Sequence, residues 1–354
     1  MIKYTIRRCL QAIPVLILIT ILLFFMMRAG GNPADRFAQN PKVTAAQILA
    51  FEHHWGLDKA LPIQYCDWLG VCGDKLPVLN ALPAFLGGGD NGVLHGDFGD
   101  STYNGVSVAT TMAGRALPTI ILMTTAYVIW ITLAIIIGVL AAVKRYSLFD
   151  SGVTIFNYVG YSLPTFWLGL MLLIIFSATL RWFPGSGIND SYTVPAFGTD
   201  SYWAYFRGNS LYTIFDLGRH MVLPVITLVT VSIAGDSRFV RSSMLDSLNQ
   251  DYVKTARAKG VPERRVILRH ALRNALLPVL TNIGLELPIL FSGAIVTEEI
   301  FGWPGMGRQL IESLGHNDYP VLMGILLVTA VLVLLANLLA DIMYAVVDPR
   351  VKYD

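Results

Sequence analysis

The sequence predicts an all-α, polytopic membrane protein with six transmembrane helices and an extracytoplasmic segment after the first of them. Of its 354 residues, 54% are hydrophobic and only 14% are charged, which is far from the composition of a soluble domain. Six apolar segments are long enough to cross a hydrocarbon core of about 30 Å, which takes roughly 20 helical residues. Lipid offers no hydrogen-bond partner to unpaired backbone N–H and C=O groups. Runs such as "VLILITILLFFMM" must therefore be helices rather than strands.

The six predicted segments divide the chain. They lie at 9–28, 117–143, 153–180, 220–240, 279–300 and 320–346. The first has too long an apolar stretch for a signal peptide and no A-x-A cleavage site after it, so we expect a retained anchor. The expected regions are a cytoplasmic N-terminus with the first helix (1–28), an extracytoplasmic segment (29–116), a core of five transmembrane helices (117–347) that includes a charged inner loop (241–278), and a cytoplasmic tail (348–354).

Basic residues predict the orientation of the chain. The net charge of +2 is too small to indicate nucleic-acid binding, so the positions of the charges carry the information. Most of the 26 lysines and arginines lie in the N-terminus, at 144–145, between 238 and 273, and in the C-terminal tail. Because short cytoplasmic loops are enriched in basic residues, we expect both termini in the cytoplasm.

The extracytoplasmic segment begins with a predicted short helix. Thr44 and Gln47 form a capping-box pair that opens "TAAQILAFEHHW", and Gly56 ends it. Cys66 and Cys72 fall on the same outer side, where a disulfide is chemically possible. Their spacing does not decide between a disulfide and two free thiols. The segment has too little regular apolar pattern for an enzyme domain, and we interpret it as a cap or docking element.

The chain lacks the motifs of an enzyme. It contains no H-E-x-x-H, P-loop or G-x-S-x-G motif, and its six histidines are scattered, so we expect no catalytic residue and no metal site. The nearest approach to a serine-hydrolase site is "GYS" at 160–162 with His220, and nothing around it forms an oxyanion hole. Without a Walker lysine, this chain cannot hydrolyse ATP alone.

Ionisable residues inside the predicted membrane segments are Asp236, Glu286, Glu298, Glu299 and Asp341. A carboxylate in hydrocarbon is costly, so each should face the bundle interior, a water path or an interface. The last three lie near segment ends, where an interfacial position is expected. Glu286 is the better candidate for a path-lining residue, with a structural hydrogen bond to a neighbouring helix as the alternative. Pro164 and Pro288 interrupt the third and fifth segments and are expected to kink them.

The inner loop contains "DYVKTARAKGVPERRVILRHALRNALLPVL", residues 251–280. Residues 247–259 are predicted to form one helix, Gly260 to close it in the left-handed conformation, and Pro262 to open the next. The second helix carries arginines at i+4 spacing opposite an apolar stripe, which suits a helix lying along the inner membrane surface. These arginines are Arg265, Arg269 and Arg273.

The first helix of this loop has a different character. Its small residues Ala256, Ala258 and Gly260 form a surface of low relief, which suits insertion into a groove of a partner protein. The alternative is a loop whose charges only fix the membrane topology.

The loop closely resembles the cytoplasmic coupling loop of the dipeptide, oligopeptide and nickel permeases of ATP-binding-cassette importers. The resemblance continues in "EEIFGWPGMGRQLIESLGHNDYP" (298–320) and "NLLADIMYAVVDPRVKY" (337–353). Earlier stretches, "GLDKALPIQY", "HGDFGDS", "RALPTIILM" and "SLPTFWLG", are similar to the first-permease type of that family. Residues 66–93 are the least similar and look like a local insertion.

The resemblance implies the type I importer transmembrane fold, in the bacterial plasma (inner) membrane. The partners that it implies are the lipid bilayer, a second homologous permease, two ATPases and an extracytoplasmic substrate-binding protein. No cofactor is implied for this chain, because ATP and magnesium belong to the ATPases. The implied function is import of dipeptides or oligopeptides, with nickel or nickel-chelate transport as the alternative. An ion-coupled secondary carrier is the alternative from another class; it would need inverted repeats and paired buried charges, and the sequence has neither.

The resemblance also implies roles for particular residues. The ATPase-coupling segment is Lys254, Thr255, Ala256, Arg257, Ala258, Lys259 and Gly260. Its first three residues occupy the Glu-Ala-Ala position of the broader importer motif and depart from it at two letters. Candidates for the translocation path are Glu286, Pro288 and Pro164.

Overall fold

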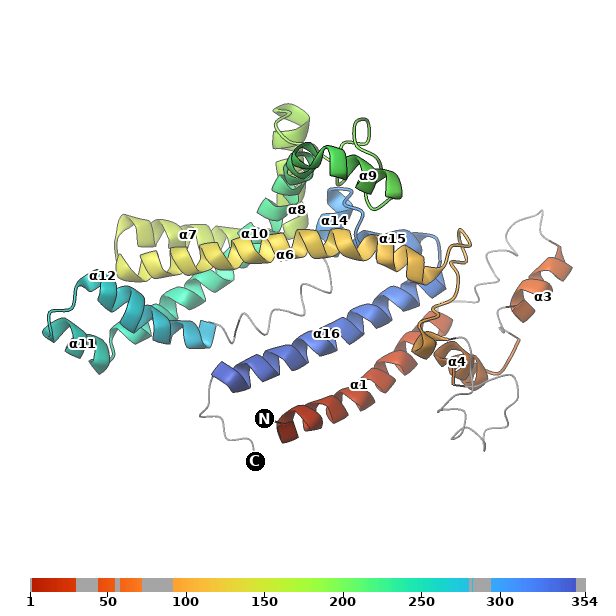
Figure 1. The fold of residues 1–354 in the computed structure, drawn as a ribbon, viewed down its shortest axis with the longest axis horizontal. Coiled ribbons are helices and arrows are strands. Elements are labelled where there is room, and N and C mark those ends of the chain that lie inside the picture. The colour runs from red at the N-terminus through yellow and green to blue at the C-terminus, as the bar shows by residue number, and fades with distance from the viewer. Residues whose placement is uncertain are drawn as a thin grey trace. The chain divides into compact units, whose positions relative to one another are not determined.

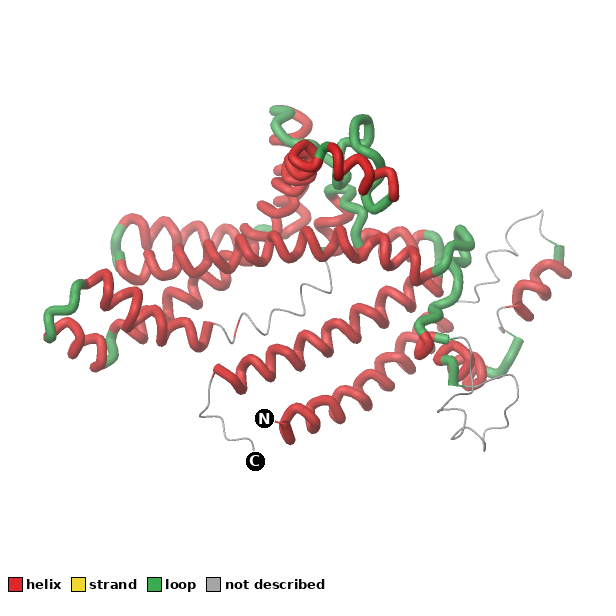
Figure 2. The backbone as a smooth tube through the Cα atoms, viewed as in Figure 1, coloured by secondary structure: helices red, strands yellow, loops and turns green. Residues whose placement is uncertain are grey.

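The structure is a computed structural model that describes residues 2–29, 44–54, 58–71, 92–279, 282 and 294–347. The described chain is built from helices and the loops that join them (Figures 1 and 2). Asp100 and Ser107 add an isolated antiparallel bridge. The predicted all-α class is confirmed. Glu286 and Pro288 lie outside the described residues, as do Cys72 and the tail 348–354.

The helices follow one another along the whole described chain (Figure 1). Their bounds are α1 (Ile2–Ala29), α3 (Ala45–His54), α4 (Leu61–Leu69), η2 (Val93–His95), α6 (Val108–Val143), α7 (Leu148–Ser162), α8 (Thr165–Leu172), η3 (Leu173–Thr179), α9 (Asp200–Gly208), α10 (Ser210–Leu248), α11 (Asp251–Ala258), α12 (Glu263–Arg265), η4 (Val266–Ala271), α14 (Ile295–Ile300), α15 (Met306–Gly315) and α16 (Tyr319–Val347). The segments η3 and η4 are π-helical.

Four helices in the described part of the chain are long and apolar enough to cross a membrane, namely α1, α6, α10 and α16. The helix observed at the predicted segment 117–143 is longer than expected, because α6 begins at Val108. The segment 220–240 likewise belongs to the longer α10. The predicted segment 279–300 falls largely outside the described residues, so that helix stays a prediction.

The third predicted segment is a broken helix rather than a kinked one. Its two parts, Leu148–Ser162 and Thr165–Thr179, are bent by 102°. Leu163 has ψ 127° and Pro164 has ψ 130°, so both leave the helical conformation. A proline excludes its preceding residue from the helical region and lacks the N–H that would continue the ladder. The pair is either one broken span or a re-entrant loop.

The chain packs as two compact units. The first unit comprises Met1–Cys9, Leu117–Arg308 and Leu332–Asp354. In its core α6 packs against α10, and a Cβ at Gly138 would lie 2.6 Å from the backbone oxygen of Ser237, so this close approach requires glycine. The buried apolar residues of this core include Leu122, Ala126, Trp130, Met221, Val225, Val229 and Trp303.

The second unit comprises Leu10–Ala116 and Gln309–Val331. Its "HGDFGDS" stretch is bound to the start of α16 through Asp318, which is buried and accepts hydrogen bonds from Ser101 Oγ at 2.5 Å and from the Thr102 N–H at 3.0 Å. Arg115 pairs with Glu312 at 3.4 Å. Two stretches far apart in the sequence are therefore joined through a buried carboxylate.

The start of the segment predicted to be extracytoplasmic has the local structure that its sequence indicates. Gln47 Oε1 accepts from the Thr44 N–H at 2.9 Å, and the Gln47 N–H donates to Thr44 Oγ1 at 3.4 Å, so the predicted capping box is confirmed. Cys66, in α4, is disulfide-bonded. The sequence left open whether Cys66 pairs with Cys72, and Cys72 lies outside the described residues.

Candidate functional site: the inner loop

The inner loop folds into two helical segments that share a small apolar core. After α10 the chain breaks at Asn249 and Gln250, and α11 starts at Asp251, which corrects the prediction of one continuous helix over 247–259. The break turns α11 so that its apolar face meets η4 and the helical residues 272–279. The core comprises Ala142, Met244, Val253, Ala256, Val266, Ala271 and Ala275. Thus α11 is packed onto its own chain as part of the first unit.

The outer face of α11 is exposed. Lys254, Thr255, Arg257 and Ala258 lie on this face, and Lys259 and Gly260 follow them on the surface. Ala256 is only 7% exposed and belongs to the core. The predicted small-residue surface is therefore divided, because Ala256 faces inward while Ala258 and Gly260 remain accessible.

The turn after α11 is a Schellman motif centred on Gly260. Gly260 has φ +71°, its N–H donates to the Arg257 carbonyl at 2.9 Å, and the Val261 N–H donates to the Ala256 carbonyl at 3.2 Å. These are the two bonds that define the motif, and glycine takes the left-handed position without strain. Val261 packs against the loop core. The predicted helix stop at Gly260 is confirmed, and Pro262 directly precedes α12 as its N-cap.

Ion pairs hold the exposed side of the turn. Arg257 donates from Nη2 to Glu263 Oε1 at 2.6 Å and from Nε to Oε2 at 3.1 Å, which is a bidentate pair across the turn. The hydrogen bond from Arg257 lowers the pKa of Glu263, and the same bond raises the pKa of Arg257. Lys254 Nζ lies 2.9 Å from Asp251 Oδ1 and lowers the pKa of that carboxyl. Both acids are therefore ionised at neutral pH.

Ser247 closes the loop at its base. Its Oγ donates to the backbone oxygen of Ala271 at 2.8 Å and lies 2.7 Å from the Tyr252 hydroxyl. These contacts join the end of α10, the start of α11 and the end of η4. Arg265, Arg269 and Arg273 are exposed, while the apolar side of the same segment packs onto the loop core; its placement on a membrane surface stays a prediction.

Glu298 is a buried carboxylate that the sequence placed at an interface. It is 0% exposed and accepts hydrogen bonds from Thr119 Oγ1 at 2.7 Å, from the Gly307 N–H at 2.7 Å and from the Arg308 N–H at 3.1 Å. Thr119 Oγ1 in turn accepts from the Met306 N–H at 2.8 Å. This network joins α6, α14 and α15. A Cβ at Gly305 would lie 2.4 Å from this carboxylate, so the site requires glycine at this position. The glycine-containing stretch after Glu298 is therefore the sequence feature that could have indicated the buried site.

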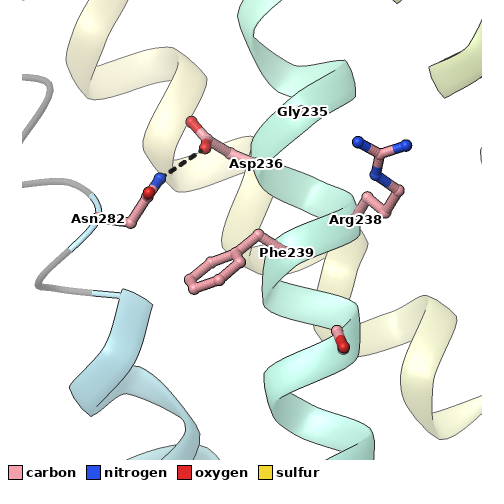
Figure 3. A pocket seen from close by; sticks show the side chains of 6 residues that line it. Gly235, Asp236, Arg238, Phe239 and Asn282 are labelled. Atoms are coloured by element: carbon pink, nitrogen blue, oxygen red, sulfur yellow. Dashed lines mark hydrogen bonds between the residues drawn. The ribbon is translucent and has the colours of Figure 1, made fainter.

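Asp236 lies on α10 beside an open cavity of about 490 Å³ (Figure 3). Its Oδ2 accepts from Trp130 Nε1 at 2.5 Å, and its Oδ1 accepts from Asn282 Nδ2 at 3.1 Å. Asp236, Phe239 and Asn282 are among the residues that line the cavity. Among the residues predicted to line the translocation path, Pro164 lies at the break between α7 and α8. It is not among the residues that line the cavity beside Asp236 on α10.

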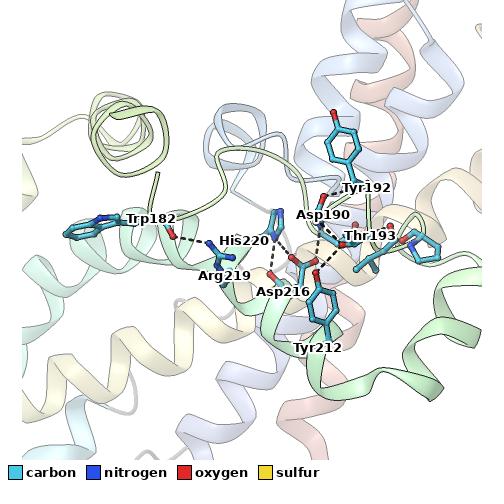
Figure 4. Close-up of polar contacts among 11 residues, drawn as sticks. Trp182, Asp190, Tyr192, Thr193, Tyr212, Asp216, Arg219 and His220 are labelled. Carbon is cyan, nitrogen blue, oxygen red and sulfur yellow. Dashed lines mark hydrogen bonds and ion pairs between the residues drawn. The ribbon is translucent and has the colours of Figure 1, made fainter. Parts of the chain in front are cut away.

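The loop between η3 and α9 is fixed to α10 by polar contacts (Figure 4). Asp216, which is buried, accepts the Asp190 N–H at 2.9 Å, and His220 Nδ1 lies 3.4 Å from Asp216 Oδ1. The hydroxyls of Thr193 and Tyr212 lie 3.1 Å apart. His220 Nδ1 also lies 2.9 Å from the Asp216 carbonyl oxygen, and Ser162 of the "GYS" stretch donates from Oγ to the Tyr158 carbonyl at 2.7 Å.

Together the apolar helices and the packed two-helix loop with its exposed α11 face define a multi-pass α-helical membrane protein. Residues 134–353 match the family of binding-protein-dependent transport system inner membrane components, and residues 1–78 match the N-terminal family of such components. The chain belongs to this family, which confirms the resemblance that the loop indicated.

Relatives match over their whole length. The oligopeptide transport system permease protein AppB of Bacillus subtilis is 38% identical over 100% of both chains. The dipeptide transport system permease protein DppB of Escherichia coli is 38% identical over 100% of this chain and 99% of its own. The glutathione transport system permease protein GsiC of Salmonella choleraesuis is 34% identical over 100% of both.

Family membership defines the general role of the chain. It is a permease subunit of an ATP-binding-cassette importer, a transport component rather than an enzyme, and not an ion-coupled carrier. Importers of this family in general combine a partner permease, ATPases and a binding protein.

Proposed function

We propose that this chain forms, with a second permease, the membrane path for dipeptides or oligopeptides delivered by an extracytoplasmic binding protein. The observation that carries the proposal is similarity over the full chain to relatives named as oligopeptide and dipeptide permeases. The similarity covers both the outer segment and the inner loop. It therefore supports the same substrate path and the same kind of ATPase coupling as in those relatives.

The exposed face of α11 is the proposed contact for an ATPase. Lys254, Thr255, Arg257 and Ala258, together with Lys259 and Gly260, offer a surface of one short helix and its turn. Ala256 lies on the opposite face of α11 and packs this helix onto the loop core. Movement of the ATPase would then carry α11, η4 and the end of α10 as one body, since Ser247 and the apolar core join them.

The proposed orientation places both termini and the inner loop in the cytoplasm, because the basic residues concentrate there. The extracytoplasmic segment 29–116 then faces the binding protein. The proposed assembly contains two ATPase subunits, which bind ATP and magnesium, and it resides in a bacterial inner membrane.

Reconstitution of the complete importer tests this function. The complex is placed in proteoliposomes with ATP on the loop side and the peptide-loaded binding protein on the other, and uptake of radiolabelled di-, tri- and pentapeptides is measured. We expect uptake that requires ATP, the ATPases and the binding protein. Uptake of nickel without peptide uptake would contradict the peptide assignment, and transport by this chain alone would contradict the importer role.

A further inference from the structure

We propose that one face of α7, together with the helix break at Pro164, lines the water-filled path through the membrane and contacts the main chain of the passing peptide. This face, called the hydroxyl face, comprises Ser151, Thr154, Tyr158, Tyr161 and Ser162, which are all exposed. The proposal rests on the proposed function, and it names the part of the peptide that this position of the path would recognise.

The α7 helix has three different faces. One face packs on α10, where the side chains of Asn157 and Ser237 exchange hydrogen bonds. At 3.6 residues per turn, the hydroxyl face forms the second side of the helix and an apolar face forms the third. The exposed residues of the apolar face are Ile155, Phe156 and Val159. Since the apolar face is the one that suits lipid, the hydroxyl face requires more polar surroundings.

The two tyrosines are the first argument. Tyr158 is 62% exposed and Tyr161 is 71% exposed, and neither hydroxyl has a hydrogen-bond partner among the residues that the structure describes. Tyr158 lies about 15 Å along α7 from Leu148, which is about half the thickness of a hydrocarbon core. Tyrosine is normally enriched at the membrane surfaces, where its hydroxyl reaches the headgroups. At this depth the hydroxyls need water or another polar partner.

The helix break beside the hydroxyl face is the second, independent argument. Leu163 and Pro164 leave the helical conformation, and the two parts of the segment are bent by 102°. Pro164 has no N–H to donate to the Gly160 carbonyl. At membrane depth such irregular backbone is tolerated only inside protein or beside a water-filled cavity. Ser162 and Pro164 are exposed, so the chain itself does not bury the break, and a water-filled path would satisfy its backbone.

The chemistry of the hydroxyl face suits a main chain rather than a particular side chain. The face carries no charge, and a hydroxyl can both donate and accept a hydrogen bond. Thr154 and Ser162 already donate to carbonyls of their own helix, which leaves them as acceptors, whereas the tyrosine hydroxyls can serve as donors. Every dipeptide and oligopeptide offers main-chain N–H and C=O groups to such contacts. The contacts are weak and do not depend on the peptide sequence, so a peptide can pass without being trapped.

The rival role for this face is packing against the second permease. Helix interfaces in membranes are enriched in small residues that let the backbones approach closely, and two protruding tyrosines do not suit such packing. The two roles also differ in an experiment, because a packed face excludes water and a path contains it.

Cysteine labelling tests where the hydroxyl face lies. Tyr158→Cys and Ser162→Cys are compared with Ile155→Cys and Val159→Cys on the apolar face, in the assembled importer in lipid nanodiscs. The probe is a membrane-impermeant, positively charged methanethiosulfonate reagent, and the unsubstituted importer supplies the background rate. We expect the thiols of the hydroxyl face to react about tenfold faster, because the reactive thiolate forms in water. If Tyr158→Cys does not assemble, Ser162→Cys decides. Equal rates on the two faces, whether fast or slow, or faster labelling of the apolar face would overturn the proposal.

Peptide uptake tests the main-chain contact. Tyr158→Phe removes only the hydroxyl, and Ile155→Val on the apolar face is the matched control. In proteoliposomes with ATP and saturating peptide-loaded binding protein, Tyr158→Phe should lower the uptake of Ala-Lys-Ala and Ala-Glu-Ala alike, by about threefold, and Ile155→Val should change neither. Unchanged uptake of both peptides, or a fall confined to one of them, overturns the main-chain contact. Absence of all peptide uptake by the wild type would instead overturn the proposed function, whereas the labelling rates are measured without peptide and do not depend on it.

Discussion

Ser247 Oγ lies 2.8 Å from the backbone oxygen of Ala271, and this hydrogen bond joins the end of α10 to the far side of the inner loop. The α11 helix lies between these two residues in the sequence and packs on the same core through Val253 and Ala256. A force applied to the exposed face of α11 therefore reaches α10 through a hydrogen bond and a continuous apolar contact. The proposed coupling role requires such a continuous path from α11 to α10.

Replacement of Ser247 by Ala should weaken this link. Loss of the hydrogen bond that this buried hydroxyl donates costs about 1 kcal/mol. We expect a lower thermal midpoint of the purified importer and fewer peptides transported per ATP hydrolysed. Ser243→Ala, one turn earlier on α10, is the matched control and should leave both unchanged. Equal effects of the two substitutions would show that Ser247 has no special role.

Substitutions at Gly260 should be tolerated according to how readily the new residue adopts a positive φ, and not according to its size. A Cβ at Gly260 meets nothing within 4 Å, but φ +71° costs a β-branched residue roughly 1–2 kcal/mol. Gly260→Val should therefore distort the Schellman turn and uncouple ATP hydrolysis from uptake while membrane insertion persists. Gly260→Asn should retain most coupling, because asparagine enters the left-handed region readily. Normal uptake by the valine variant would exclude the role of this turn in coupling.

Glu298→Gln should destabilise the chain, whereas Glu299→Gln should not. Thr119 Oγ1 and the Gly307 and Arg308 N–H groups each donate to the Glu298 carboxylate, so an amide NH₂ group there would face a donor. The expected loss is about 1–3 kcal/mol, measured as a lower thermal midpoint of the detergent-solubilised protein. Glu299 is exposed and serves as the control. Equal midpoints for the two variants would contradict the structural role of the buried network.

The Arg257–Glu263 pair should give the loop a pH dependence on the acid side. Arg257 lowers the pKa of Glu263 below its usual value of 4.5, so the pair contributes at higher pH and its contribution is lost as pH falls through the lowered value. Wild type should exceed Glu263→Gln slightly in thermal midpoint at pH 7. The difference should shrink as the pH falls below 4.5 and vanish once the pH is below the lowered pKa of Glu263. A difference that persists in acid would show that the pair is not its cause.

Local chemistry explains which features the sequence could predict. The stop at Gly260, the start after Pro262 and the Thr44–Gln47 cap depend on neighbouring residues, and the structure has all three. The helix break at Asn249 and the burial of Ala256 depend on contacts with η4 and Met244, which periodicity does not contain.

Carboxylates held by residues distant in the sequence were the least predictable features. Glu298 and Thr119 are 179 residues apart, so no local pattern brings them together. Asp236 was visible as an acidic residue in an apolar segment, but its cavity and its contact with Trp130 depend on the packing of α6 against α10. The break at Pro164 was predicted in position and underestimated in size, because its 102° bend depends on what the second half of the segment packs against.

Site-specific crosslinking tests the central claim, which is that the exposed face of α11 contacts an ATPase. A photoreactive benzophenone amino acid is placed at Ala258 or, as the matched control, at Arg269, which is exposed on the second segment of the same loop. In the assembled importer, we expect Ala258 to crosslink to an ATPase with a yield that changes on ATP binding, and Arg269 to give no ATPase product. An ATPase crosslink from Arg269 with none from Ala258 would contradict the account.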